Sequence, residues 1–219
     1  MRHILDLVVS RLALLALLGA AALASGCGPT AGARVENVSA ASPAAPGERV
    51  AGSPVAVGDY SLYDLHGAWR NQRGDTLHLS ALAGQVRVIA MVYTSCQATC
   101  PLIIADLKRI ESAVAPAQRA AVGFVLVSLD PWRDTPGRLA EWAAATGLDP
   151  ARWTLLSGSD DSVRELAASL DVRYASQRGG EIAHTNGLTV LDRDGRMAHQ
   201  HTGIGDTDAT IRTVRALLQ

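Results

Sequence analysis

The sequence predicts an α/β domain in which helices flank a central, mostly parallel β-sheet. Apolar, β-branched segments alternate along the chain with segments whose apolar residues recur at helical spacing. Strands separated by helices pair in parallel, and the helices then pack on the faces of the sheet. Of the 219 residues, 48% are hydrophobic and 19% are charged, so the chain can bury a core and wholesale disorder is excluded.

The predicted elements follow one another in a regular order. A short β-hairpin is expected first, with strands at 60–64 and 76–78 around a polar turn. The main strands are expected at 86–93, 122–128, 153–156 and 187–191. Helices are expected at 101–114, 135–146, 159–170 and 206–218. The tight turn Asp192–Gly195 predicts a second β-hairpin, whose last strand covers 196–200.

The first 26 residues have the features of a secretory signal. Two arginines precede the apolar run Leu12–Ala24, which at thirteen residues is shorter than the roughly 20 that a membrane-spanning helix needs. Ala22–Ala24 suits ordinary signal cleavage, whereas Leu23–Cys27 resembles a bacterial lipobox in which Cys27 carries the lipid. The cysteine count favours the lipobox, because lipidation of Cys27 removes the odd cysteine of an exported protein that has three.

Three regions therefore divide the chain: the signal at 1–26, a tether at 27–57 and a folded domain at 58–219. The tether is rich in Ala, Gly, Pro and Ser and has no apolar period. We expect export to the periplasmic face of a bacterial inner membrane, with an anchor at Cys27. The net charge is −1, so the chain does not have the excess of basic residues that a nucleic-acid-binding protein needs, and this class of function is excluded.

Two cysteines stand between a predicted buried strand and a predicted helix. Cys100 precedes Pro101 and is expected at the N-cap, with Cys96 in the turn before it. The helix dipole and its free N–H groups there favour thiolate over thiol. The pair could form a redox-active disulfide, hold a metal ion, or form a purely stabilising disulfide. The carboxyl end of a central strand, where α/β proteins place their sites, favours a functional pair.

A soft metal needs more ligands than two sulfurs, and an imidazole is the natural third. His184 lies just before the strand 187–191 and is the candidate. His199 and His201 share one face of a strand and could form a separate weak site, although an exposed strand edge is the simpler interpretation.

Three segments together resemble the SCO/SenC family of copper chaperones. They are VYTSCQATCP (Val92–Pro101), SLDPWRDTP (Ser128–Pro136) and IAHTNGLTVLDRDGR (Ile182–Arg196), and their order and spacing also match. The resemblance covers about residues 58–218 and implies a thioredoxin-like fold. It also implies a membrane-tethered protein that acts outside the cytoplasm and assists copper-centre assembly in cytochrome c oxidase.

By this resemblance, Cys96, Cys100 and His184 bind copper, and Asp130 supports the site without being a ligand. Two thiolates and a neutral imidazole suit Cu(I), and Cu(II) stays open. Oxidation of the cysteines to a disulfide abolishes the site. The implied partners are the copper-centre subunit of the oxidase and a copper donor or thiol reductant. The alternative is a thiol–disulfide oxidoreductase that reduces target cysteines before metallation or acts in redox signalling.

Overall fold

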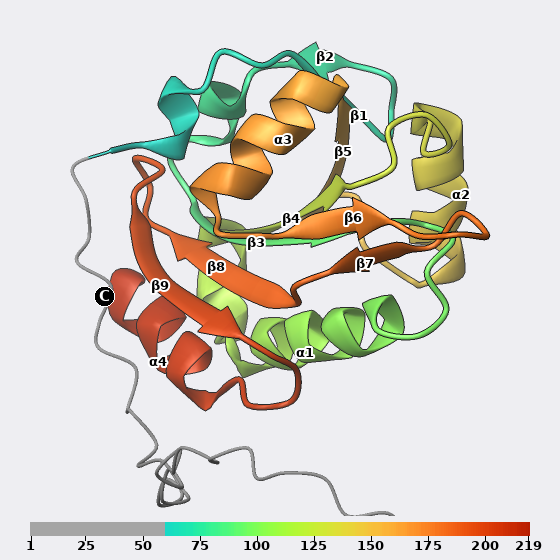
Figure 1. Cartoon of the computed structure of the whole chain (residues 1–219). Helices are drawn as coiled ribbons and strands as arrows, with labels where there is room; N and C mark the ends of the chain where they lie inside the picture. The colour runs from blue at the N-terminus through green and yellow to red at the C-terminus, as the bar shows by residue number, and fades with distance from the viewer. Residues whose placement is uncertain (1–59) are drawn as a thin grey trace, which may run out of the picture. The chain divides into compact units, whose positions relative to one another are not determined.

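A seven-stranded β-sheet forms the centre of residues 60–219, the part of the chain that the computed structural model describes (Figure 1). The strand order is β2-β1-β5-β4-β3-β8-β9. The predicted signal at 1–26, the tether at 27–57 and Cys27 lie outside the described residues.

The predicted parallel centre is confirmed. β3 (Val86–Val92) pairs in parallel with β4 (Val122–Ser128), and β4 pairs in parallel with β5 (Trp153–Gly158). Every residue of β4 is buried, as is every residue of β3 except Arg87. Their β-branched and apolar residues form strands here because both faces of the sheet are covered.

Four helices cover the sheet. α1 (Cys100–Ala113) contacts β3, and α4 (Asp208–Leu217) contacts β8 and β9. These two helices lie side by side on one face, whereas α3 (Asp160–Ser169) lies on the opposite face (Figure 1). α2 (Pro136–Ala145) packs against β5 and β1. Side chains of Thr135 and Ser159 accept backbone N–H groups at the starts of α2 and α3, which is how those two helices begin.

The N-terminal hairpin differs from its prediction. The strand expected at 60–64 is wrong, because Leu62–Asp64 forms a 3-10 helix, η1, that begins at a Ser61 side-chain cap. The first strand is instead β1 (Trp69–Asn71), which pairs with β2 (Thr76–Leu77) around the predicted polar turn. Two further 3-10 helices are η2 (Leu79–Leu82) and η3 (Pro116–Ala121).

Two hairpins follow α3. The predicted C-terminal one is confirmed as β8 (Gly187–Leu191) with β9 (Met197–Thr202), which are antiparallel and extend the sheet beyond β3. The other was not predicted: β6 (Tyr174–Ser176) and β7 (Ile182–His184) form a separate two-stranded sheet. This β6–β7 hairpin reaches across the molecule between α3 and α1 (Figure 1).

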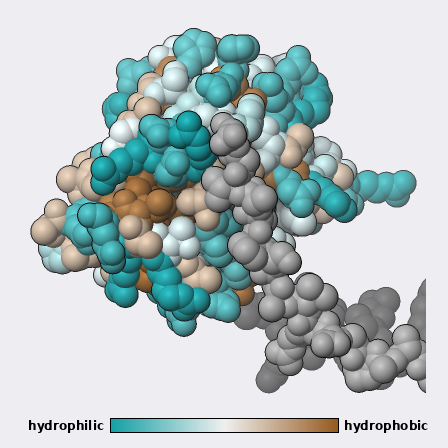
Figure 2. Space-filling view, turned by 90° about the vertical axis from the view of Figure 1, so that its left-hand side faces the viewer, coloured by the Kyte–Doolittle hydropathy of each residue, from teal (hydrophilic) through white to brown (hydrophobic). Residues whose placement is uncertain are grey.

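On the side shown in Figure 2, hydrophilic and weakly apolar areas alternate on the surface of the described part, and a strongly apolar area lies in the left half of the view. Among the large apolar side chains, Trp132 is the most exposed, at 82%. None of the helices within residues 60–219 has both the length and the apolar character needed to cross a membrane.

Candidate functional site

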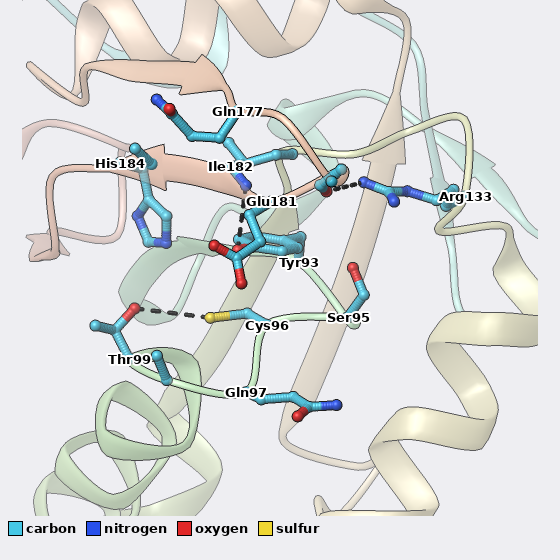
Figure 3. A pocket seen from close by; sticks show the side chains of 14 residues that line it. Tyr93, Ser95, Cys96, Gln97, Thr99, Arg133, Gln177, Glu181, Ile182 and His184 are labelled. Carbon is cyan, nitrogen blue, oxygen red and sulfur yellow. Dashed lines mark hydrogen bonds between the residues drawn. The ribbon is translucent and has the colours of Figure 1, made fainter. Parts of the chain in front are cut away.

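A pocket of about 680 Å³ opens where β3 ends, and the β6–β7 hairpin forms its opposite wall (Figure 3). The turn between β3 and α1 contributes Cys96 and Thr99, and the hairpin contributes Glu181 and His184. Between β3 and this pocket wall the chain turns into α1, which begins at Cys100 and has Pro101 in its first turn. The pocket thus lies at the carboxyl end of a central parallel strand, as the sequence predicts.

The start of α1 differs in detail from the prediction. Thr99, not Cys100, is the N-cap, and Cys100 is the first helical residue. The Thr99 side chain does not cap the helix, and the Cys96 sulfur accepts the Cys100 N–H instead, at 3.4 Å. The Thr99 hydroxyl lies 3.7 Å from the same sulfur (Figure 3). Cys96 therefore receives the N–H groups and the positive end of the helix dipole.

The two cysteines are free thiols, and their pKa values are shifted in opposite directions. Partial burial opposes ionisation of Cys96. Hydrogen bonds from the Cys100 thiol, the Cys100 N–H and Thr99 outweigh this burial and lower its pKa from 9.0 to about 7. Burial raises the pKa of Cys100 well above its ordinary value, and the nearby charges of Cys96 and Asp134 raise it further. Burial therefore opposes at Cys100 the thiolate that the sequence predicts for both sulfurs.

His184 ends β7 and points into the pocket toward Cys96 and Thr99 (Figure 3). Its Nδ1 lies 3.1 Å from the Thr185 carbonyl oxygen, which can only accept a hydrogen bond, so Nδ1 carries the proton. Nε2 is buried and has no hydrogen-bond partner within the described chain. Burial lowers the pKa of His184, which favours the neutral ring. This tautomer leaves the Nε2 lone pair available to a ligand in the pocket.

The three predicted site residues are gathered in one region but are not assembled into a metal site. Cys96 and His184 line the pocket, while Cys100 is fully buried and does not line it. Nowhere in residues 60–219 do three His, Cys, Asp or Glu side chains stand in an arrangement that could hold a metal ion together. Joint coordination therefore requires the hairpin and the Cys96 turn to approach each other.

Two aspartates of the segment 128–136 support the pocket from outside. Buried Asp134 accepts the Thr94 N–H at 3.0 Å, and its carboxylate also accepts the hydroxyls of Thr94 and Ser128, so it joins the ends of β3 and β4. Asp130 pairs with Arg133, whose guanidinium donates to the Gly180 carbonyl oxygen at the tip of the hairpin. Neither carboxylate lines the pocket.

Two pocket residues were missed at the sequence level. The Tyr93 hydroxyl accepts the Ile182 N–H at 3.2 Å, which ties the hairpin to the end of β3. The Glu181 carboxylate hangs into the pocket above Cys96 (Figure 3). Gly179 and Gly180, directly before it, both have positive φ and form a turn, but no feature of the sequence indicates that this turn faces the cysteines.

His199 and His201 lie outside this pocket, on strand β9 at the edge of the sheet. Both rings are half-buried, and neither Nε2 has a hydrogen-bond partner within the described residues. Both histidines are therefore less exposed than the sequence analysis expects for residues at an exposed strand edge. Burial lowers the pKa of His199, and the positive charges of His201 and Arg212 lower it further.

The sequence of this domain is similar to those of known proteins. The family model described as SCO1/SenC matches residues 58–219. The SCO1 protein homolog of Bacillus subtilis (strain 168) is 25% identical over 142 residues, which is 64% of this chain and 73% of that protein. The matches cover 63% to 73% of the length of the curated relatives.

Solved structures agree with this match. A SCO1/SenC family lipoprotein from Bacillus anthracis superposes with a TM-score of 0.64 at 25% identity, covering 72% of this chain and 96% of that one. ScoI from Bradyrhizobium japonicum, solved with copper bound, has a TM-score of 0.57 at 23% identity and covers 69% and 94%. The fold is thioredoxin-like, as the sequence resemblance implied. With a family model that spans the whole domain and relatives that share its fold, the chain belongs to the SCO1/SenC family.

Proposed function

We propose that this protein is an extracytoplasmic metallochaperone that carries copper on Cys96, Cys100 and His184. The observation that carries the proposal is the unpartnered Nε2 of His184, which shares a pocket with the Cys96 sulfur at the start of α1. A buried imidazole nitrogen without a partner is unfavourable unless a ligand takes its lone pair. The copper bound in a solved family relative supports copper as that ligand.

The donor set fits Cu(I). Cys96 is the readily ionised sulfur, His184 is neutral, and Cys100 lies directly behind Cys96, to which its thiol hydrogen-bonds. Thiolate and imidazole donors are those that soft copper prefers. Cys100 must lose its proton to join, so binding releases that proton and affinity falls as the pH falls.

The whole chain extends this proposal to a place of action. Residues 1–26 would direct export, Cys27 would carry a lipid, and 27–57 would tether the domain at 58–219 near the membrane surface. A Bacillus anthracis family member described as a lipoprotein supports the anchor. We propose the copper-centre subunit of cytochrome c oxidase as the recipient, supplied by a copper donor.

A Cu(I) titration of the reduced protein against a competing chelator tests the proposal. His184→Ala should weaken binding by at least about tenfold, since even residues that only support metal ligands typically matter by 10–100-fold. Exposed His78 lies outside the pocket, so His78→Ala is the matched control and should bind as the parent does. Equal affinity in the parent and in His184→Ala would remove the imidazole from the site.

A second candidate function is a thiol–disulfide oxidoreductase. It is favoured by the position of Cys96 in the pocket, its lowered pKa, and the buried Cys100 thiol next to it. The Cys96 thiolate would attack one sulfur of a partner disulfide and release the other as a thiolate. Cys100 would then lose its proton and attack the Cys96 sulfur of the mixed disulfide, which releases the second partner thiol. The partner gains the two electrons, and the Cys96–Cys100 pair becomes a disulfide.

One of two variants distinguishes the two candidate functions. Cys96→Ser abolishes both copper binding and disulfide reduction. His184→Ala weakens only copper binding, because the exchange uses no imidazole ligand. A His184→Ala protein that loses disulfide reduction but keeps Cu(I) affinity would contradict both assignments.

A further inference from the structure

We propose that His199 makes the packing of α4 on the sheet sensitive to pH, so that acid loosens α4 from β9. The inference uses none of the residues of the pocket and is independent of both candidate functions. Because α4 also packs against α1, the helix that begins at Cys100, this interface lies one helix away from the pocket.

The two histidines of β9 lie between the sheet and α4. His199 and His201 alternate along the strand with Gln200, whose side chain donates to the Leu170 carbonyl oxygen at the end of α3. α4 contacts β9 and lies on the face of the sheet opposite to α3 (Figure 1). Both imidazoles therefore face α4.

This interface contains several buried polar atoms that have no hydrogen-bond partner among the described residues. They are Nε2 of His199 and of His201, and the hydroxyls of Thr207 and Thr210 on α4. Thr207 is the N-cap of α4, yet its side chain does not cap the helix. An imidazolium needs partners for a second N–H and for a full charge, so such a place costs it more than it costs a neutral ring. Packing of α4 therefore favours neutral His199.

The charges that act on His199 increase this preference. Burial lowers the pKa of His199, and the positive charges of His201 and of Arg212 on α4 lower it further. Neither histidine forms an ion pair with a carboxylate within residues 60–219. A proton on His199 would thus meet two cationic neighbours and no acidic partner.

The charged side chains of the flanking segments are engaged with the backbone. On α1, buried Asp106 accepts the Gly205 N–H at 2.8 Å, and Arg109 donates to the Gly205 carbonyl oxygen at 3.0 Å. At the start of α4, Asp206 accepts the Asp208 N–H at 3.3 Å. These carboxylates hold the loop that leads into α4.

The sign of the pH effect follows from the lowered pKa. When α4 opens, His199 returns to the ordinary histidine pKa of about 6.5, so opening takes up a proton in mild acid. The stabilisation of packed α4 is therefore fully present above that pH and decreases below it. At about pH 5.5, one histidine that stays neutral while α4 is packed makes opening about tenfold more frequent.

Amide hydrogen exchange of the reduced, metal-free protein at about pH 7.5 and about pH 5.5 tests the inference, after correction for the intrinsic pH dependence of exchange. In the parent, protection of the amides of α4 should fall by about tenfold, while α2 keeps its protection. His199→Gln, which is neutral at both pH values, should remove most of this fall. His66→Gln is the matched control, because His66 is exposed and lies far along the chain from β9 and α4, and it should behave as the parent does.

Arg212→Gln provides a second variant. Arg212 is exposed, so the fold should persist, and removal of its charge should reduce the loss of α4 protection in acid. Equal protection of α4 at the two pH values in the parent would overturn the inference. It is equally wrong if α2 loses protection together with α4, which indicates global unfolding, or if both variants lose as much α4 protection as the parent.

Discussion

Cys96 and Cys100 show how strongly a few ångströms decide the chemistry of a side chain. Both belong to one turn, yet Cys96 receives hydrogen bonds at the helix start, while Cys100 is fully buried beneath it. The same helix start that lowers the pKa of one thiol therefore leaves the other protonated. In either proposed function Cys96 is the sulfur that reacts first.

Alkylation of the reduced protein with iodoacetamide tests this difference. The rate at Cys96 should rise with pH and reach half its maximum near the pKa of about 7, because the thiolate is the reacting form. Cys100 should stay unlabelled at that pH in the folded protein, since it is buried and protonated. Mass spectrometry of peptides locates the label, and equal labelling of both cysteines at neutral pH would contradict the assignment.

Asp134 is the residue whose loss should harm the fold most among those around the pocket. Asp134→Asn removes a charged acceptor from three buried hydrogen bonds, and we expect a loss of about 2 kcal/mol or more in the free energy of unfolding. Urea unfolding measures it. Asp161→Asn is the control, because its side chain is 91% exposed and its loss should change stability by less than about 0.5 kcal/mol. Equal stabilities would mean that the network is dispensable.

The β6–β7 hairpin is the element that completes the site. It pairs with no strand of the main sheet, and the Tyr93 hydroxyl and the Arg133 guanidinium fasten it to the pocket. It carries His184, so its approach to Cys96 decides whether the proposed donors meet. An element held by a few polar contacts can move at lower free energy than a strand within the core.

Tyr93→Phe should loosen this hairpin. The substitution leaves the buried Ile182 N–H without its acceptor, which typically costs about 1–3 kcal/mol. Amide hydrogen exchange at 182–184 should therefore accelerate. Tyr63→Phe, which removes a hydrogen bond from η1 to the Leu82 carbonyl oxygen in η2, should leave that exchange unchanged. Unaltered exchange in Tyr93→Phe would show that other contacts hold the element.

At the scale of the molecule, the sequence predicts those elements whose own residues show which side is buried, either as a continuous apolar run or as apolar residues at helical spacing. β3, β4, β8 and the four helices follow from apolar runs and helical spacing. β6 and β7 were missed because each has only three residues, Ile182 alone among them is buried, and the pair is fixed by contacts distant in sequence. The protonation of Cys100 and the position of Glu181 likewise depend on packing between separate segments, which local patterns do not encode.

The proposed lipid anchor at Cys27 belongs to this scale as well. Cys27→Ser should release the exported protein from the membrane fraction, because the lipid would have no attachment point. Fractionation measures the release, and mass spectrometry of the mature N-terminus distinguishes a lipidated Cys27 from cleavage after Ala24. A protein that stays membrane-bound after Cys27→Ser would contradict the lipid anchor.

In the proposed function, two sulfurs and one imidazole converge on a single copper ion. X-ray absorption spectroscopy of the reduced, Cu(I)-loaded protein tests it most directly, because the copper edge reports its nearest neighbours. We expect sulfur scattering with the outer-shell signature of one imidazole, and loss of that signature in His184→Ala. A parent spectrum with sulfur neighbours only, or one that His184→Ala leaves unchanged, would contradict the account.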